Sequence, residues 1–308
     1  MIAKITLGTR GSELARAQTL LVEKAIRSVH PSVVVETKII VTRGDNAKFR
    51  DPRAGRKGLF TAEIERALLA GEVNVAVHSA KDLPSETSRG AEIVAALPRA
   101  PVNDVLISKH SADLAGLPGG ATVATGSVRR QRQLHWKRAD LKLVDLRGNV
   151  PTRLRKLAEN DWDGIVLAAA GLERLGLSPA LSEIGFEGRQ FFLEILAGEI
   201  FLPAGGQGII AVQSRIDDES AKALLDPVND CETLLCLQAE REFLRRLHGD
   251  CNFPVGVLAT ISNENMKMRA QLFESESPEP REGEVEGGRE EGAMLARELL
   301  RKIEQEHE

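Results

Sequence analysis

Long hydrophobic runs are absent from the sequence, and cysteines are few. No apolar stretch approaches the roughly 18 to 20 residues that a membrane-spanning helix needs. The first residues, MIAKITLGTRGS, enter a strand-like pattern almost at once, so we expect no signal or transit peptide and a cytoplasmic protein. The odd set of 3 cysteines, Cys231, Cys236 and Cys251, argues against a disulfide framework.

Signatures of nucleotide and nucleic-acid binding are absent too. The sequence contains neither GxxxxGK(S/T) nor GxGxxG, the loops that hold nucleotide phosphates. With a net charge of -4, the chain lacks the overall positive charge of a general nucleic-acid binder. Trp136 is the only aromatic residue between positions 127 and 156, where stacking platforms would be needed. We therefore expect no nucleic-acid partner and no membrane partner.

The composition is that of a globular protein with more than one domain. Its 308 residues, 42% hydrophobic and 28% charged, exceed what one ordinary core accommodates. Strand-like and helical patterns alternate along most of the chain, which predicts an α/β fold. The expected strands are residues 2–7, 33–41, 73–77, 121–125, 141–146, 164–168, 209–212, 255–261 and 266–273.

Two similar stretches indicate two related α/β lobes. LGTRGSELARAQ, starting at residue 7, and VATGSVRRQRQL, starting at residue 123, both read as strand, small polar loop, serine and helix. Ser12 is placed to cap the first of these helices. Glycine-rich residues 203–208 are expected to form a hinge or crossover between the lobes. The predicted domains are a first lobe at 1–98 with a return at about 205–226, a second lobe at 103–202, and a C-terminal domain at 230–308.

An acidic segment precedes the last expected helix, which lies near residues 293–303. Residues 274–291 hold eight glutamates, one valine and no aromatic residue. Such a composition buries little apolar surface. We therefore predict a solvated loop here and assign it no chemistry.

Polar side chains follow the expected strand at residues 73–77. The valines of VNVAVHSAKDLP lead into His78, Ser79, Lys81 and Asp82. Because α/β folds place chemistry at the carboxyl edge of the sheet, Asp82 is the first candidate for a catalytic carboxylate. A turn-forming role for Asp82 is the alternative, and we expect His78 to be structural.

The strongest local signal is positive charge. Residues 127–156 hold ten basic side chains against two aspartates, although the chain is acidic overall. Arginine predominates, which favours two-point binding of carboxylate or phosphate. Arg129 and Arg130 begin a helix and Arg147 follows a strand, so we expect them at one sheet edge, beside helix N-termini. A small polycarboxylate fits this pattern best, and a solvated basic helix face is the alternative.

The cysteines allow more than one role. Cys231 and Cys236 fall in an expected long helix, where we predict packed core thiols. Together with His248 and Cys251 they could instead ligate zinc, but their spacing does not place both thiols on one helix face. We therefore predict no metal. Cys251 lies in the loop LHGDCNFPVG, where a thiol is either a nucleophile or attachment point, or inert.

Nine short motifs occur in order along essentially the whole chain. They are TRGS (9–12), VTRGD (41–45), KGLF (57–60), VHSAKDLP (77–84), TGSVRRQRQL (125–134), LRGNVPTRL (146–154), AAAGLERLGL (168–177), LPAGGQGI (202–209) and GDCNFPVG (249–256). Together they resemble the motifs of the hydroxymethylbilane synthase family, also called porphobilinogen deaminase. So many ordered motifs exceed what chance similarity produces.

The resemblance implies a fold, a cofactor and site residues. The family's fold has two lobes like those of periplasmic binding proteins, with mixed sheets, and a smaller C-terminal α/β domain whose cysteine carries a dipyrromethane through a thioether. By motif, that cysteine is Cys251, and the catalytic aspartate is Asp82. The implied cofactor-binding residues are Lys81, Ser127, Arg129, Arg130, Arg147 and Arg153. The implied substrate-binding residues are Arg10, Ser12, Lys57 and Arg174.

The resemblance also implies a reaction. Four porphobilinogen molecules are condensed head to tail with loss of ammonia, and the linear tetrapyrrole hydroxymethylbilane is released by hydrolysis. Asp82 would protonate the departing amine and, as a carboxylate, stabilise positive charge. The implied protein is a monomer that passes its product to uroporphyrinogen-III synthase. The alternative is a non-catalytic two-lobed binding protein for a small polycarboxylate, which would not explain a loop thiol.

Overall fold

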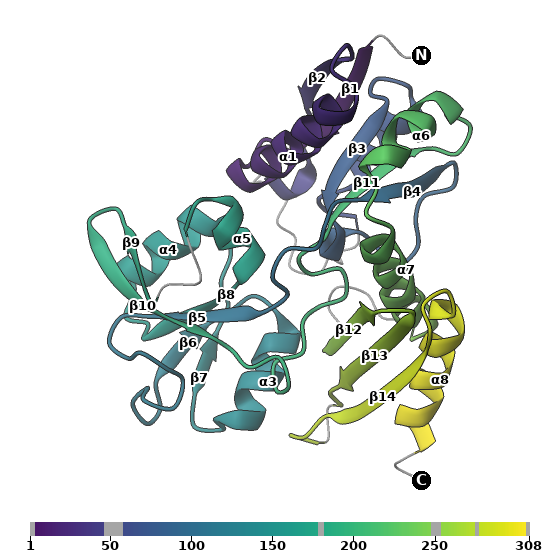
Figure 1. Ribbon diagram of the computed structural model, residues 1–308. Coiled ribbons are helices and arrows are strands. Elements are labelled where there is room, and N and C mark those ends of the chain that lie inside the picture. Colours follow the sequence, from purple (N-terminus) through teal and green to yellow (C-terminus); the bar gives the residue numbers. More distant parts are fainter. Residues whose placement is uncertain (1–3, 46–57, 178–181, 248–253, 275–276, 306–308) are drawn as a thin grey trace.

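A computed structural model describes residues 4–45, 58–177, 182–247, 254–274 and 277–305. These residues form three β-sheets, each with its own helices (Figure 1). The expected class, α/β with two lobes and a smaller C-terminal domain, is therefore confirmed, while the domain limits stay predictions. In the described part of the chain, no helix has the length and apolar character needed to cross a membrane.

The first lobe is built on a five-stranded mixed sheet. Its strands are β1 (Lys4–Thr9), β2 (Val34–Ile39), β3 (Val75–Ser79), β4 (Ala91–Ala96) and β11 (Ile210–Arg215), and its helices are α1 (Glu13–Val29), α2 (Ala62–Leu69) and α6 (Glu219–Leu225). The strand order is β2-β1-β3-β11-β4. β1 is parallel to β2 and β3, whereas β11 is antiparallel to both of its neighbours. Short helical turns, η1 (Arg43–Asp45) and η4 (Asp226–Val228), complete the lobe.

Apolar side chains on the two faces of this sheet pack against different helices. Val75 and Val77 of β3 belong to the cluster formed with α1, whereas Ala76, between them, packs against α2. Each fully buried valine contributes about 1.5 to 3 kcal/mol relative to an exposed one. Because side chains alternate along a strand, His78 lies on the α2 face and Ser79 on the α1 face.

The second lobe contains a six-stranded mixed sheet. Its strands are β5 (Asp104–Ser108), β6 (Thr122–Ala124), β7 (Lys142–Val144), β8 (Gly164–Ala168), β9 (Glu183–Phe186) and β10 (Arg189–Ile195), and its helices are α3 (Val128–Lys137), α4 (Val150–Glu159) and α5 (Ala169–Arg174). The strand order is β7-β6-β8-β5-β10-β9. The three strands β6, β7 and β8 are parallel, and β5, β9 and β10 add antiparallel pairs.

Side-chain caps start the helices next to the loops of interest. The Oγ of Ser12 accepts a hydrogen bond from the Ala15 amide at 3.3 Å, which confirms the expected cap of α1. Ser127 caps α3, and Asn149 caps α4. Each cap stabilises its helix by about 1 kcal/mol, so the loops that enter these helices have defined conformations.

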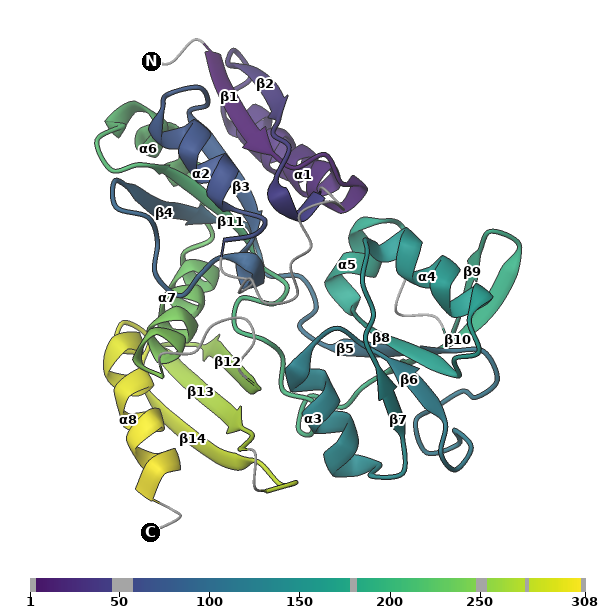
Figure 2. The same ribbon diagram turned by 180° about the vertical axis from the view of Figure 1, so that it is seen from behind.

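Two segments, residues 97–103 and 196–209, cross between the lobes. After the second crossing, β11 enters the first sheet between β3 and β4. The lobes also meet where α1 lies beside α5 (Figures 1 and 2). A Cβ atom at Gly171 of α5 would lie 3.8 Å from the Leu14 Cδ2 atom of α1, at ordinary van der Waals distance, so α5 and α1 are in direct contact.

The C-terminal domain is a three-stranded antiparallel sheet with two helices on one face (Figure 1). Its strands are β12 (Val255–Ser262), β13 (Asn265–Leu272) and β14 (Arg281–Gly288), and its helices are α7 (Cys231–Arg246) and α8 (Gly292–Gln305). Met266 and Met268 of β13 pack with Phe243 and Leu299 of the helices in one buried cluster. The domain therefore has its own core.

The prediction of a solvated loop at residues 274–291 was wrong, because β14 lies within that segment. Glu282, Glu284 and Glu286 occupy exposed positions, while Val285 between them is buried. Gly283 and its counterpart four residues later face α8, where a Cβ at Gly283 would lie 2.8 Å from Ile303 Cγ1. The side of β14 that faces α8 is therefore packed through glycines and one valine and not through large apolar side chains. Cross-strand pairs such as Lys267–Glu284 at 2.6 Å stabilise the outward side.

Strands β4, β5, β9 and β10 were also not predicted from the sequence. β9 and β10 form a hairpin whose turn residues, Glu187 and Gly188, both have positive φ angles, 48° and 77°. A turn of this type matches the twist of an antiparallel pair. The pair adds an antiparallel edge to the second sheet, next to β5.

Candidate active site between the lobes

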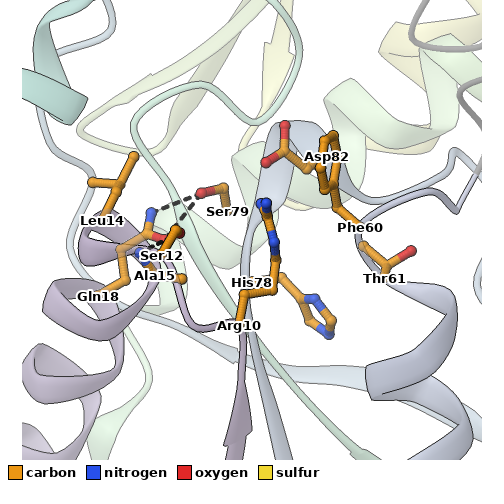
Figure 3. Close-up of a pocket in the computed structure, with 10 residues that line it drawn as sticks. All are labelled: Arg10, Ser12, Leu14, Ala15, Gln18, Phe60, Thr61, His78, Ser79 and Asp82. Carbon is orange, nitrogen blue, oxygen red and sulfur yellow. Dashed lines mark hydrogen bonds between the residues drawn. The ribbon is translucent and has the colours of Figure 1, made fainter. Parts of the chain in front are cut away.

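Asp82 lies beyond the carboxyl end of a strand, as the sequence predicted. A single helical turn, η3 (Ala80–Asp82), follows β3 directly. Asp82 is half-buried and lines a pocket on the first lobe (Figure 3). The other residues that line this pocket are Arg10, Ser12, Leu14, Ala15, Gln18, Phe60, Thr61, His78 and Ser79.

The pocket combines a cation, a carboxylate and an aromatic ring. Arg10 follows β1, which is a parallel neighbour of β3, so Arg10 and Asp82 lie at the same edge of the sheet. The Cζ atom of Arg10 lies 4.0 Å from the centroid of the Phe60 ring, which is a cation–π contact. Figure 3 shows the Arg10 side chain extending toward the part of the pocket that holds Phe60 and Asp82. The arrangement suits a flat molecule with acidic substituents.

Gln18 is a pocket residue that the sequence analysis missed. Its Nε2 and Oε1 atoms lie 2.8 and 3.0 Å from the hydroxyl oxygen of Ser79 (Figure 3). Gln18 is only 2% exposed and shares the buried face of α1 with Val22 and Ile26. In the sequence Gln18 falls at helical spacing with Val22 and Ile26, and a polar residue at such a position was the signal that could have revealed it.

His78 is a neutral polar group in this pocket. Burial lowers its pKa to about 4, the nearby Gln213 side chain opposes that change, and the positive charges of Arg241 and Arg10 add to it. Among the described residues, the Nε2 atom of His78 has no partner with hydrogen-bond geometry. The pocket therefore gains no positive charge from His78 at neutral pH.

Lys81 lines a second pocket, which lies between the lobes. The Lys81 Nζ atom donates a hydrogen bond to the Gln207 Oε1 atom at 3.3 Å. Burial, together with the charges of Arg130 and Arg129, lowers the pKa of Lys81 to about 8, against the opposing effects of Asp82 and Asp104. The pocket also includes residues of α1, α5 and the crossover: Leu14, Gln18, Ser79, Ala168, Ala170, Gly171, Arg174, Gly206, Gly208 and Ile209.

Arg174, at the end of α5, connects the second lobe to the crossover. Its Nη2 atom donates a hydrogen bond to the Gly208 carbonyl oxygen at 2.6 Å. Burial lowers the pKa of Arg174 to about 10. Arg174 lines the same inter-lobe pocket as Lys81, and this pocket adjoins the pocket that contains Arg10, because Leu14, Gln18 and Ser79 line both.

Arg129 and Arg130 are almost fully buried, at 4% and 6% exposure. Both contact the carboxylate of Asp104, the first residue of β5, at 2.8 and 2.7 Å. Burial alone would raise the pKa of Asp104, but the charges of the two arginines outweigh it and hold that pKa well below its usual range. The sequence predicted neither this burial nor the shared aspartate.

Gln207 joins this buried group to Lys81. Its Nε2 atom donates to the Asp104 Oδ1 atom at 2.8 Å and to the Val102 carbonyl at 2.7 Å, while its Oε1 atom accepts from Lys81. Gln207 is 1% exposed. A hydrogen-bonded path thus runs from the inter-lobe pocket to Arg129 and Arg130.

The remaining predicted basic residues of the second lobe lie apart from these groups. Arg147 is exposed and pairs with Asp145 at 2.6 Å. Arg153 donates to the Gly148 carbonyl at 2.7 Å, and Ser127 caps α3. Neither of the two pockets described here is lined by Ser127, Arg147 or Arg153. They lie around the N-terminal ends of α3 and α4.

Lys57 and Cys251 lie outside the described residues. Of the other two cysteines, Cys236 is buried and Cys231 is exposed. The prediction of a core thiol is therefore correct for Cys236 and wrong for Cys231, which begins α7 where the helix surface meets solvent. Burial raises the pKa of Cys236 to about 12. Within the described ranges no group of His, Cys, Asp and Glu side chains could hold a metal ion.

A buried ion pair connects the C-terminal domain to the crossing segments. The Arg99 Nη1 and Nη2 atoms donate to the two carboxylate oxygens of Glu240 at 2.7 and 3.2 Å. The same carboxylate accepts from the Gly206 amide at 2.6 Å and the Ala259 amide at 2.8 Å. Arg99 also donates to the carbonyl of Gln207 at 3.0 Å. α7 and β12 are thus fixed to the segment that carries Gln207.

Comparisons with known proteins give one family. A model described as "Porphobilinogen deaminase, dipyromethane cofactor binding domain" matches residues 5–223, and one described as "Porphobilinogen deaminase, C-terminal domain" matches residues 234–305. A porphobilinogen deaminase of Roseiflexus sp. (strain RS-1) is 46% identical over 269 residues, which are 87% of this chain and 85% of the relative. A porphobilinogen deaminase of Syntrophomonas wolfei subsp. wolfei is 43% identical over 305 residues, 98% and 95% of the two chains.

Solved structures similar to the chain include two binding proteins. The methionine binding protein MetQ has a TM-score of 0.46 and 16% identity, with 75% of this chain and 92% of that one covered. The probable amino-acid ABC transporter extracellular-binding protein ytmK of Bacillus subtilis has a TM-score of 0.41 and 9% identity, with 74% and 90% covered.

Proposed function

Because the chain belongs to the porphobilinogen deaminase family, we propose that it is a transferase, a hydroxymethylbilane synthase, with Asp82 as its catalytic carboxylate. It condenses four porphobilinogen molecules head to tail, releases ammonia and forms the linear tetrapyrrole of haem biosynthesis. The observation that carries the assignment of Asp82 is its position: a half-buried carboxylate at a strand end, in a pocket with Arg10 and Phe60.

Asp82 has two tasks in this reaction. The aminomethyl carbon–nitrogen bond of porphobilinogen breaks, the electron pair leaves with nitrogen, and a proton is needed for ammonia to depart. Protonated Asp82 supplies that proton. The resulting carboxylate then stabilises the positive charge that remains on the pyrrole ring, in a pocket that the Phe60 ring also lines.

Arg10, Ser12, Lys57 and Arg174 are proposed to bind the acidic groups of the substrate. Porphobilinogen carries an acetate and a propionate, and arginine binds a carboxylate through two parallel N–H groups. The cation–π contact with Phe60 orients the Arg10 guanidinium before substrate arrives. Neutral His78 leaves Arg10 as the main cation of that pocket.

The basic residues of the second lobe fit the dipyrromethane cofactor. The Nε–H groups of Arg129 and Arg130 are buried donors without a hydrogen-bond partner among the described residues, and such donors would suit the carboxylates of this group. The bound cofactor supplies the primer to which each new pyrrole is joined. Lys81, Ser127, Arg129, Arg130, Arg147 and Arg153 would hold its acidic groups, and Cys251 would attach it through a thioether.

The domain division and cellular setting are part of the same proposal. The first lobe comprises residues 1–98 and about 205–226, the second 103–202, and the C-terminal domain 230–308. The family matches, which end at 223 and resume at 234, support a division near residue 230. The protein acts as a cytoplasmic monomer and passes its product to uroporphyrinogen-III synthase.

Intact mass spectrometry tests this function. Protein expressed in a haem-making host should be heavier than its sequence by two linked pyrrole units, and Cys251→Ser should have the mass of the bare chain. Asp82→Asn should keep the added mass but lose about 10²- to 10⁴-fold in turnover. Glu86→Gln, an exposed carboxylate four positions away, is the control and should match the wild type.

The outcomes separate the two candidate functions. A wild-type mass equal to the bare chain, with no consumption of porphobilinogen, would support the non-catalytic binding protein for a polycarboxylate. Near-normal turnover in Asp82→Asn would remove the catalytic role from that residue and leave the family assignment intact.

A further inference from the structure

We propose that Asp104 is a positioning residue that assembles Arg129, Arg130 and, through Gln207, Lys81 into one buried cluster for a single dicarboxylate pyrrole ring. The proposal rests on the proposed function, because it concerns how this chain holds its pyrrole cofactor. Asp104 is not among the site residues that the sequence motifs imply. It acts through the basic residues rather than on the reacting atoms.

Both oxygens of the Asp104 carboxylate contact an arginine, and among the described residues only Oδ1 has partners with hydrogen-bond geometry. Oδ1 accepts from the Arg130 Nη2 atom at 2.7 Å and from the Gln207 Nε2 atom at 2.8 Å. Oδ2 lies 2.8 Å from the Arg129 Nη1 atom. Asp104 is 0% exposed, so no water competes for these contacts and the carboxylate sets the positions of three side chains at once.

Each partner has a second contact that limits its rotation. Arg129 donates from Nη1 to the Leu202 carbonyl at 2.7 Å, and Arg130 donates from Nη1 to the Val166 carbonyl at 2.9 Å. Gln207 is held by the Val102 carbonyl. Two guanidinium groups are therefore fixed while their Nε–H groups stay buried and without a hydrogen-bond partner among the described residues, which leaves donors for a ligand.

The charge of the cluster defines the ligand class. Three cations and one carboxylate leave two positive charges in a region where Asp104, Arg129 and Arg130 are all nearly excluded from solvent. Unbalanced charge is costly in such surroundings. One pyrrole ring with an acetate and a propionate carries two negative charges and would balance it. The carboxylate of Asp82 is not counted in this balance, because Asp82 lines the pocket on the first lobe together with Arg10.

Lys81 connects the cluster to the outside. It is half-buried and lines the inter-lobe pocket, whereas the two arginines line neither described pocket. A carboxylate that enters between the lobes therefore contacts Lys81 first. Gln207 hydrogen-bonds to both Lys81 and Asp104 and so holds the lysine at a fixed position relative to that aspartate.

The rate of cofactor loading tests the proposal. Chains expressed in a host that makes no porphobilinogen are incubated with porphobilinogen, and the fraction with added mass is followed by intact mass spectrometry. Asp104→Asn raises the net positive charge of the cluster, so charge alone predicts faster loading. A positioning role predicts the reverse: the loading rate of Asp104→Asn should fall by about tenfold or more. Asp104→Glu should recover part of the rate.

A matched control and a second variant keep the outcome decisive. Asp163→Asn changes a carboxylate of the same lobe that accepts from the Thr122 amide at 2.7 Å and should load like the wild type. If Asp104→Asn does not fold, Gln207→Met decides, because it keeps both arginine pairs and removes the side-chain link between Asp104 and Lys81, together with the contact to the Val102 carbonyl. It should fold, and it should load more slowly than the wild type.

Two results are distinguishable. Wild-type loading, or faster, in a folded Asp104→Asn or in Gln207→Met overturns the positioning role while leaving the proposed function in place. A wild-type chain that never gains mass refutes the proposed function itself.

Discussion

Glu240→Gln should destabilise the protein by about 3 to 5 kcal/mol, the cost of breaking a buried charge pair by changing one partner. Glu240 is 0% exposed and accepts four hydrogen bonds, two from Arg99 and one each from the Gly206 and Ala259 amides. The glutamine amide would keep one acceptor oxygen and turn an NH₂ group toward groups that only donate. The Arg99 guanidinium, 13% exposed, would lose its counter-charge.

Thermal unfolding followed by calorimetry measures this effect. At about 1.5 °C per kcal/mol, from an unfolding entropy of about 2.1 cal/mol/K per residue and 308 residues, the melting temperature should fall by about 5 to 8 °C. Glu232→Gln, an exposed position of the same helix whose nearest arginine is 3.9 Å away, should change it by less than about 2 °C. A Glu240→Gln melting temperature within that smaller range would refute the reasoning. Replacing both Arg99 and Glu240 by Met should recover part of the loss, since it removes the unpaired charge.

Three further predictions concern the site and its supports. The pKa of Lys81 is about 8, so its charge is present below that pH and lost above it; the rate of cofactor loading should fall above about pH 8 in the wild type but not in Lys81→Arg. Phe60→Leu removes the cation–π contact and should raise KM by about two- to fivefold in steady-state assays. Gly256→Ala would place a Cβ 2.7 Å from the Leu202 carbonyl oxygen and should cost about 1 to 3 kcal/mol in denaturant unfolding, whereas Gly119→Ala, with open space around it, should be neutral.

The pH dependence that Lys81 gives to folding stability has the opposite sign to the pH dependence that it gives to binding. The pKa is about 8 in the folded protein against 10.5 for an unperturbed lysine, so between these values the unfolded chain binds more protons. The contribution of Lys81 to stability therefore increases as pH rises through that window. A matched comparison with Lys81→Met isolates this contribution.

Much of the fold was predictable from local sequence patterns. Alternating valines revealed β3, and a serine after a small polar loop revealed the start of α1. These features depend on neighbours within a few residues. β14 was missed because its glycines are suited to a strand only when α8 packs on them, and the pattern of glutamates on its other face is that of a solvated segment.

The candidate site was predictable only in part. Asp82 and Arg10 stand at strand ends and were found from their position. Asp104 and Gln207 were not found, because their partners lie 26 and 103 residues away in the sequence. The concentration of arginines was visible, but whether Arg129 faces solvent or a buried aspartate depends on the packing of α3 against β5, which no local pattern encodes.

The place of β11 in the first sheet has a consequence for synthesis of the chain. β11 lies between β3 and β4, yet it follows the whole second lobe in the sequence. On the ribosome, β3 and β4 must wait for residues 210–215 before their sheet can close, while β5 to β10 emerge as one continuous block. We expect the second lobe to fold first during translation. The strand that presents Asp82 would gain its second neighbour, β11, only afterwards, so the catalytic edge would be among the last parts of the two lobes to form.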